Sequence, residues 1–471
     1  MSSVAEASER AYDVMVIGGG AAGGAAAIAA AEAGARVCLV EAGPAIGGST
    51  ALSGGFVMAA DTAFLREHGV EDTVDAFYED VMKVNGGSVD PVAVRRICET
   101  AKDTIEWLQT IGVTFFHDPY VRRGHATAGG GEQLMRHVEA EVSNKGVDVA
   151  VQTRVTKLVT DENGTVRGAE IDGEPILAGA VVLTTGGYGA NPDMVRDFMP
   201  RSQLAGDWIY YVGGAYNRGD GILMAQALNA AVRGEDQGML GTGNGFRKHT
   251  EVYVPSWAMV VNEDGVRFGN EFATYWGFPE MLRRQPNHHG FAILDGNMLE
   301  NAKADRRIAE YHRQGLTQVS WLPDDFHEKI ADGVVKTADS LTELAGKLGM
   351  DPQALESSVA RYNKFCETGV DEDFGKEAID LTPILKPPFA AVEIRNHLLW
   401  LTHGGLQVNA DAQVLNEDNK PISGLYAAGE VVNNVNGATY FGTGFSISSS
   451  LTLGRIAGAA AAMFAAATQE V

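Results

Sequence analysis

A glycine-rich turn between an apolar segment and a run of small residues constrains the fold of this chain more than any other feature. Residues 13–17 are mostly apolar, and Gly18-Gly19-Gly20-Ala21-Ala22-Gly23 follows at once. A short apolar run that stops at glycine is typical of a buried parallel strand. We expect a helix over 21–33, ended by Gly34, and a second strand over 36–40. The sequence therefore predicts a Rossmann-type βαβ unit within an α/β fold.

Gly18, Gly20 and Gly23 have the spacing of a dinucleotide-binding fingerprint. Gly18 permits a tight turn, Gly20 lets the backbone approach a pyrophosphate, and Gly23 lets the helix pack close to the strand. The free N–H groups at the start of the helix favour the phosphates. Glu41 lies about 20 residues further on, at the tip of the second strand, where a carboxylate binds ribose hydroxyls. The chain holds one such fingerprint, so we expect one bound dinucleotide.

Later segments resemble the flavoprotein family of the fumarate reductases, succinate dehydrogenases and 3-ketosteroid dehydrogenases. These segments are residues 43–55, 182–188, 217–221, 424–430 and 437–458. In that family the first segment wraps the FAD diphosphate and flavin ring, and the resemblance covers most of the chain. It implies that the dinucleotide is FAD. No histidine occurs where the complex-II members attach FAD covalently, so we expect non-covalent FAD.

The resemblance adds a larger set of expected FAD contacts to Gly18, Gly20, Gly23 and Glu41. These are Ala22, Ala42, Gly48, Ser49, Thr50, Ser53, Gly54, Gly55, Gly186, Asp220, His403, Gly429, Glu430, Ser446 and Ile447. The carboxylate of Glu430 is implied to lie near the ribityl chain of the flavin. A helix is expected after Gly444, and its N-terminus would stabilise negative charge on the reduced flavin.

The order of the segments predicts a Rossmann-type FAD-binding domain with an inserted α+β capping domain. The FAD-binding domain is expected over 1–233 and 390–471, and the cap over 234–389, ending at Lys386-Pro387-Pro388-Phe389. The resemblance implies that the cap is a mobile lid and that substrate binds in the cleft between the domains.

Two tyrosines stand where the fumarate reductases of this family use arginines. Tyr275 follows Arg267-Phe268-Gly269-Asn270-Glu271 at the position of the proton-donating arginine, and Tyr440 stands at that of the carboxylate-binding arginine. Both residues resemble the 3-ketosteroid dehydrogenase branch, which uses a cap tyrosine as base and a Tyr-x-Gly-x-Gly loop to polarise a ketone. The resemblance implies that Tyr275 takes the proton, and that the Tyr440 hydroxyl and Gly444 N–H hold the enolate oxygen. Tyr120 is a candidate helper of the base.

The expected activity is FAD-dependent α,β-dehydrogenation of a cyclic ketone, such as 4-oxocyclohexanecarboxylate or a 3-ketosteroid. The loop has Phe441 where the steroid enzymes often have proline, and the chain is shorter than theirs, so a smaller ketone is favoured. Arg122, Arg123 or Arg247 is a candidate for binding a substrate carboxylate, although surface arginine is the usual interpretation. Tyr120 and Tyr275 also have an alternative interpretation, in which each only packs against its neighbours.

Two other functions stay open. The first keeps the fold and reverses the chemistry, as a reductase of an enone or unsaturated acid. The second is a flavin-bearing electron-transfer subunit with no substrate of its own. The electron acceptor of a desaturase is also open, since oxygen, a quinone and a carrier protein all fit. His125 is expected to be a structural histidine.

Composition narrows the partners and the compartment. The net charge of −24 disfavours binding to nucleic acid and anionic membranes. Cys38, Cys98 and Cys366 lie far apart without a CxxC pair, so no metal site, redox dithiol or c-type haem is expected. The apolar run 14–33 contains five glycines, which favours strand, turn and helix over a membrane span. We expect a cytoplasmic protein without stable membrane insertion.

Overall fold

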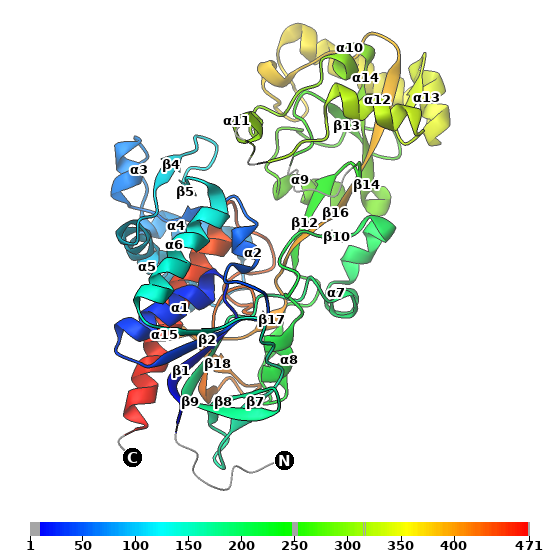
Figure 1. Cartoon of the computed structure of the whole chain (residues 1–471). Coiled ribbons are helices and arrows are strands. Elements are labelled where there is room, and N and C mark those ends of the chain that lie inside the picture. The colour runs from blue at the N-terminus through cyan, green and yellow to red at the C-terminus, as the bar shows by residue number, and fades with distance from the viewer. Residues whose placement is uncertain (1–9, 247–252, 314, 316, 470–471) are drawn as a thin grey trace. The chain divides into compact units, whose positions relative to one another are not determined.

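The computed structural model describes residues 10–246, 253–313, 315 and 317–469, and the chain divides into two compact units (Figure 1). Unit 1 comprises Met1–Pro200, Gly213–Met239 and Leu401–Val471, and unit 2 comprises Arg201–Val212 and Leu240–Trp400. The units differ from the predicted domains at both ends of the cap. Residues 201–212 belong to unit 2, and unit 2 extends along a long strand to Trp400. The roles of the two domains stay predictions.

Unit 1 is built on a largely parallel sheet in the order β18-β19-β9-β1-β2-β6, with β8 also pairing with β9 and β7 with β8. The strands are β1 (Tyr12–Ile17), β2 (Val37–Val40), β6 (Asp148–Ala150), β7 (Leu158–Thr160), β8 (Val166–Ile171), β9 (Glu174–Leu183), β18 (Gln413–Leu415) and β19 (Pro421–Ala427). Strand β1 pairs in parallel with β2 and β9, and β9 pairs in parallel with β19. The predicted Rossmann-type unit is therefore confirmed, and segments from both ends of the chain complete its sheet.

Helices α1 (Ala21–Glu32) and α15 (Phe445–Ala467) pack against each other and against the sheet of unit 1. Their contact is close because small residues face each other. A Cβ on Gly454 would lie 2.4 Å from the Ala22 carbonyl oxygen, and one on Gly458 would lie 2.0 Å from that of Ala26. Helix α15 is long and apolar enough to cross a membrane by length and composition, but half of its apolar window is buried inside the structure.

The remaining elements of unit 1 surround this core. They are α2 (Gly48–Ala51), β3 (Phe56–Met58), α3 (Ala63–Glu67), α4 (Val74–Asn85), α5 (Pro91–Thr110), β4 (Phe115–His117), β5 (Gly124–Thr127), α6 (Gly130–Asn144), α7 (Pro192–Phe198), α8 (Asp220–Gln226), β11 (Val232–Arg233) and β17 (Gly405–Leu406). Strands β3, β5 and β4 form a small antiparallel sheet. Cys38 and Cys98 are buried, and burial raises the pKa of each thiol to about 12.

Unit 2 is an α+β unit around a mostly antiparallel sheet in the order β10-β16-β14-β13, with β12 and β15 also paired to β16. Its elements are η1 (Pro200–Trp208), β10 (Tyr210–Tyr211), β12 (Gly238–Gly243), β13 (Met259–Val261), α9 (Gly277–Arg283), η2 (Pro286–His288), β14 (His289–Leu294), α10 (Gly296–Glu300), α11 (Ala309–Arg313), α12 (Pro323–Ala331), β15 (Lys336–Ala338), α13 (Leu341–Leu348), α14 (Pro352–Thr368), η3 (Ala378–Asp380) and β16 (Phe389–Thr402). Residues 201–212 join this unit because β10 pairs with Leu398 and Leu399 of β16.

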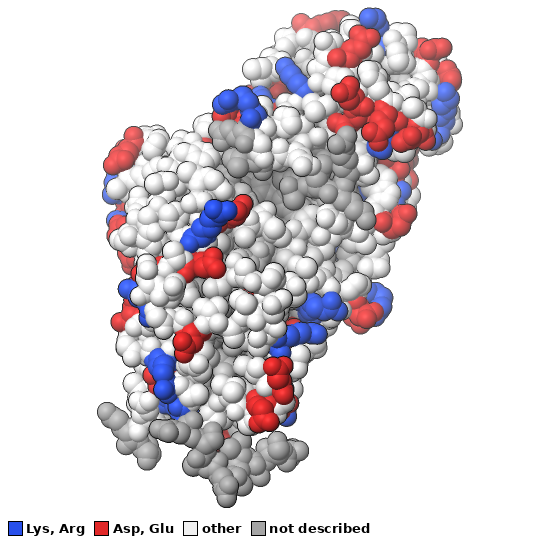
Figure 2. Space-filling view, viewed as in Figure 1, with Lys and Arg blue, Asp and Glu red and all other residues white. Residues whose placement is uncertain are grey.

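Acidic and basic side chains lie intermixed on the face shown in Figure 2.

Candidate active site

Three glycines in the turn after β1 and in the first turn of α1 have different surroundings. A Cβ on Gly18 would lie 2.4 Å from the Thr184 carbonyl oxygen, and one on Gly23 would lie 1.8 Å from that of Gly18. Protein packing therefore explains both of these glycines. A Cβ on Gly20 would meet nothing within 4 Å, although Gly20 directly precedes α1. The open space at a helix N-terminus fits the predicted pyrophosphate, which would take the place of the missing side chain.

The carboxylate of Glu41 lies beside this turn and is buried. Its two oxygens accept hydrogen bonds from Gly19 N–H (2.6 Å) and Gly43 N–H (2.5 Å). Each carboxylate oxygen has a second lone pair, so the group retains acceptor capacity for ribose hydroxyls. Ala42, a further predicted FAD contact, lies between Glu41 and Gly43 in the sequence.

The segment around α2 is tied to the first turn and to the loop before α8. A Cβ on Gly48 would lie 3.3 Å from Gly20 Cα. Ser49 Oγ accepts hydrogen bonds from Gly214 N–H (2.9 Å) and Asn217 Nδ2 (2.8 Å). Asn217 is also the neighbour of Gly186, because a Cβ there would lie 2.6 Å from Asn217 Oδ1. The structure thus brings predicted FAD contacts from three parts of the sequence together.

The end of this segment is fixed by its own side chains. Ser53 Oγ donates to the Thr50 carbonyl (2.6 Å) and accepts from Gly55 N–H (3.2 Å). A Cβ on Gly55 would lie 2.5 Å from the backbone of Gly130, whereas Gly54 is exposed. These bonds set the path of the predicted flavin-wrapping loop.

Glu430 and His403 lie at a second junction within unit 1. Glu430 Oε1 accepts hydrogen bonds from Thr402 N–H (2.8 Å) and Thr402 Oγ (2.9 Å). Burial raises the pKa of Glu430, and the bonds from Thr402 oppose this effect. His403 Nδ1 lies 2.8 Å from the Gly437 carbonyl oxygen and is buried. A Cβ on Gly429 would lie 3.0 Å from Ala22 Cβ, so this junction adjoins α1.

Asp220, at the start of α8, forms a two-pronged ion pair with Arg154 at 2.6 and 2.8 Å. The Arg154 side chain is half-exposed, whereas Asp220 is buried. Arg154 is therefore a partner of a predicted FAD residue that the sequence did not single out.

Tyr440 lies buried in the loop that leads into α15, and the loop is fastened to the end of α4. Asn85 Oδ1 accepts from Thr439 N–H at 3.1 Å, immediately before Tyr440. Immediately after it, the Phe441 ring packs 6.0 Å from that of Phe77 on α4. Gly444 has a φ of +94°, which favours glycine, and caps α15. Ser446 and Ile447 follow in the first turn of that helix.

Tyr120, the candidate helper of the base, and His125, the expected structural histidine, lie near β4 and β5. Tyr120 is on the connecting loop with 47% of its surface exposed, and its N–H donates to Asp118 Oδ1 (2.8 Å). His125 is fully buried, with Nε2 2.8 Å from Thr62 Oγ. Burial lowers the pKa of His125 to about 4, so the ring is neutral at pH 7, and its structural role stays a prediction.

The candidate carboxylate-binding arginines have different surroundings. Arg123 is buried rather than a surface residue, because it pairs with Asp72 and, at 2.7 Å, with Asp80. Arg122 is exposed and donates to the Glu71 carbonyl (3.0 Å). Arg247 lies outside the described residues. Among those residues, no cluster of three or more histidine, cysteine or acidic side chains could hold a metal.

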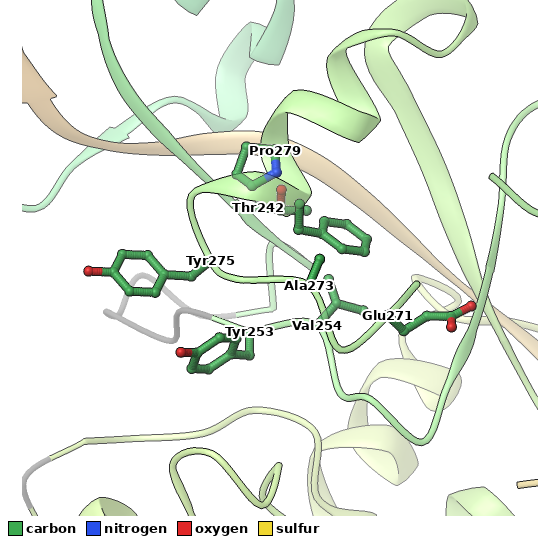
Figure 3. Close-up of a pocket in the computed structure, with 8 residues that line it drawn as sticks. Thr242, Tyr253, Val254, Glu271, Ala273, Tyr275 and Pro279 are labelled. Carbon is green, nitrogen blue, oxygen red and sulfur yellow. The ribbon is translucent and has the colours of Figure 1, made fainter. Parts of the chain in front are cut away.

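Tyr275 belongs to unit 2 and lines a small pocket there (Figure 3). The other lining residues are Thr242, Tyr253, Val254, Glu271, Ala273, Phe278 and Pro279. The Tyr275 ring contacts Trp276 (4.9 Å between ring centres), Trp400 (5.2 Å) and Tyr253 (5.8 Å). Figure 3 shows the Tyr253 and Tyr275 rings projecting in the same direction, while the Glu271 carboxylate points away from them.

Glu271 belongs to a buried ionic network behind the pocket. Arg267 donates to both of its oxygens (3.1 and 2.9 Å) and to Asp371 (2.9 Å), and Lys376 Nζ lies 3.1 Å from it. Burial alone would raise the pKa of Glu271, but Lys376 and Arg267 more than offset this and lower it. The carboxylate is therefore ionised and neutralised by its two partners.

Comparisons with known proteins agree with the predicted flavoprotein family. The FAD binding domain family matches residues 13–447. The chain is 32% identical to the NADH:fumarate oxidoreductase of Klebsiella pneumoniae, over 97% of this chain and 48% of that protein. It is 31% identical to the probable fumarate reductase Ifc3 of Shewanella frigidimarina, over 98% of this chain and 77% of the relative. The chain thus spans about half of the first relative and three quarters of the second.

A solved structure extends the likeness to a dehydrogenase. The 3-ketosteroid-Δ4-(5α)-dehydrogenase of Rhodococcus jostii, in complex with 4-androstene-3,17-dione, aligns with a TM-score of 0.79 and 27% identity, over 98% of this chain and 99% of that one. The family match and these likenesses also bear out FAD as the cofactor. This chain belongs to the FAD binding domain family, and it is an FAD-dependent oxidoreductase related to the fumarate reductases.

Proposed function

We propose that this protein is an FAD-dependent desaturase that introduces a double bond α,β to the carbonyl of a cyclic ketone. The observation that carries the proposal is the lining of the Tyr275 pocket. Among its described residues the only charged side chain is Glu271, which Arg267 and Lys376 already neutralise. The described side chains around Tyr275 are therefore mostly apolar or aromatic, which suits a ketone ring better than a carboxylate, and the one arginine beside them, Arg307, is already paired with Asp305.

The residues divide the chemistry between them in this proposal. Tyr275 takes the proton when the α C–H bond breaks, and the electron pair of that bond forms the enolate. The Tyr440 hydroxyl and the Gly444 N–H donate hydrogen bonds to the enolate oxygen, which stabilises the developing charge. FAD, when bound, supplies the acceptor for the hydride that leaves the β carbon. Loss of that hydride completes the carbon–carbon double bond and balances the reaction.

The FAD is held without a covalent bond in this proposal, and the protein works in the cytoplasm. Gly18, Gly20 and the N-terminus of α1 would hold the pyrophosphate, and Glu41 the ribose. Glu430 would lie near the ribityl chain. The division into an FAD-binding domain and a cap that brings Tyr275 to the substrate is part of the same proposal.

A second candidate function is the reverse reaction, reduction of an enone or unsaturated acid. The observation in its favour is the identity of 31–32% with an NADH:fumarate oxidoreductase and a probable fumarate reductase. The same tyrosines would then protonate the α carbon and polarise a carbonyl. Because Tyr440 stands where an arginine is expected in a fumarate reductase, a ketone is favoured over a dicarboxylate, whether the enzyme oxidises or reduces its substrate.

The deciding experiment mixes oxidised enzyme anaerobically with saturated cyclohexanones and 3-ketosteroids, one at a time, and follows the flavin absorbance. Bleaching by a saturated ketone supports the desaturase. If no ketone bleaches the flavin, but an enone or fumarate reoxidises the chemically reduced enzyme, the reductase takes its place.

Tyr440→Phe tests the enolate-binding role directly. Loss of one such donor typically lowers kcat by about 10²–10³-fold, and FAD content should not change. The control is Tyr78→Phe, a half-buried tyrosine on α4 that stacks with Arg95 and should keep the wild-type rate. A wild-type rate for Tyr440→Phe would remove Tyr440 from the mechanism.

A further inference from the structure

Among the described residues that line the pocket, Tyr253 is the one tyrosine besides Tyr275, the proposed base. The two rings are perpendicular, with centres 5.8 Å apart, so the edge of one ring faces the other. Both rings line the same pocket and project in the same direction (Figure 3). Edge-to-face packing of this kind restricts the ring orientation of both partners.

Arg307 connects the two segments that carry these tyrosines. Its guanidinium lies 3.9 Å from the centre of the Tyr253 ring, on the ring face. It donates to the Val254 carbonyl (3.1 Å) and to the Ala273 carbonyl (2.7 Å). Val254 follows Tyr253 directly, and Ala273 precedes Tyr275 by two residues. One side chain thus fixes the backbone beside both tyrosines.

Arg307 is itself held rigidly by Asp305. The two Asp305 oxygens accept from Arg307 Nε (2.7 Å) and Nη2 (2.9 Å), and one of them also accepts from Ser256 N–H (2.6 Å). Both side chains are buried, with 6% of Arg307 and 2% of Asp305 exposed. Burial alone would raise the pKa of Asp305, but Arg307 more than offsets this and lowers it. The pair is therefore ionised and has little freedom to move.

We infer that Tyr253 is a positioning residue for Tyr275, and that Arg307 holds the two tyrosines in register. The inference rests on the proposed function, in which Tyr275 receives the α proton. Proton abstraction requires the phenol oxygen at hydrogen-bonding distance from the reacting group, and a displacement of about 1 Å can cost about 100-fold in rate. The Tyr253 ring affects the rate of proton abstraction by keeping Tyr275 in place.

The test compares two substitutions of Tyr253 in the FAD-loaded enzyme, with a ketone that bleaches the wild-type flavin. Tyr253→Leu removes the ring, and kcat should fall about 10- to 100-fold with little change in KM. Tyr253→Phe keeps the ring and should restore most of the rate. Phe291→Leu, a half-buried ring on β14, is the matched control and should leave the rate unchanged. A wild-type rate for Tyr253→Leu, or an equal loss for Tyr253→Phe, would overturn the inference.

Arg307→Lys is an independent variant that keeps a cation opposite Asp305 but removes the forked contacts to both carbonyls. It should lower kcat in the same way at full FAD content, and an unchanged kcat would overturn the role of Arg307.

A double-mutant cycle with Tyr275→Phe separates this inference from the proposed function. If Tyr253 acts through Tyr275, Tyr253→Leu should cause no further loss once Tyr275 is phenylalanine. If Tyr275→Phe is slow but the two losses multiply, the positioning role fails and the proposed function stands. A wild-type rate for Tyr275→Phe alone would instead overturn the proposed function.

Discussion

Gly20→Ala should weaken FAD binding and leave the fold intact, whereas Gly23→Ala should disturb the fold. The two glycines are three residues apart but have different neighbours. A Cβ on Gly20 meets no protein atom within 4 Å, and its φ of −75° and ψ of −170° suit any residue. A Cβ on Gly23 would lie 1.8 Å from the Gly18 carbonyl oxygen, far inside van der Waals contact. The methyl group therefore competes with the ligand at Gly20 and with the protein at Gly23.

The expected magnitudes follow from these contacts. At Gly20 the methyl group pushes the pyrophosphate away from the N–H groups of α1, and losing one hydrogen bond to a charged group costs about 1.5–3 kcal/mol. At about 1.4 kcal/mol per factor of ten, the Kd for FAD should rise about 10- to 150-fold. At Gly23, helix α1 must move away from β1, and overpacking of this kind costs about 1–3 kcal/mol or more of folding free energy.

The assay titrates each apoprotein with FAD, following the change in flavin fluorescence, and melts the same apoprotein without FAD. Gly346→Ala on α13 of unit 2 adds the same methyl group into open space and serves as the control. We expect a raised Kd with an unchanged Tm for Gly20→Ala, and a lowered Tm for Gly23→Ala. A wild-type Kd for Gly20→Ala would refute the reasoning, because the pyrophosphate would then not lie at this turn.

Three further predictions concern other parts of the chain. The pKa of His125 falls from 6.5 to about 4 on folding, so about 3 kcal/mol of stability should be lost as the pH falls through that window. His125→Gln should flatten this part of the pH profile of chemical unfolding. Glu271→Gln leaves Arg267 and Lys376 without their shared carboxylate and should destabilise unit 2 by about 3–5 kcal/mol, seen as faster hydrogen exchange. Acid precipitation should release FAD into the supernatant, and flavin in the pellet would contradict non-covalent binding.

The sequence predicted the part of the fold in which neighbouring residues decide the structure. The first strand, the glycine turn and the helix are local, and the helix ends at Glu32, within one residue of the expected bound. The residues after Gly444 and the alanine-rich run 458–467 both predict helix, and in the structure α15 runs without a break from Phe445 to Ala467. The reason is that Gly454 and Gly458 let α15 pack closely on α1. The two helices are more than 400 residues apart in the sequence, so no local pattern predicts this contact.

Other features depend on pairings that leave no local pattern. Strand β10 has only two residues, and its pairing with β16 helps to place residues 201–212 in unit 2. The sequence predicts Arg123 as a surface arginine, yet its side chain is buried and pairs with Asp72 and Asp80. Tyr253 precedes Tyr275 by 22 residues, and only the folded chain brings the two rings together.

In the proposed function, the residues that hold FAD and the residues that set the substrate are different. The turn at Gly20, the carboxylate of Glu41 and the junction at Glu430 are proposed to hold FAD, and FAD serves a reductase and a dehydrogenase equally well. Direction and substrate depend instead on what receives or delivers the α proton and on what holds the carbonyl. The proposed function assigns those tasks to Tyr275 and Tyr440, and a neutral phenol polarises a ketone where an arginine would bind a carboxylate. The enzyme's choice between ketone and dicarboxylate should therefore follow these two side chains rather than overall identity to fumarate reductases.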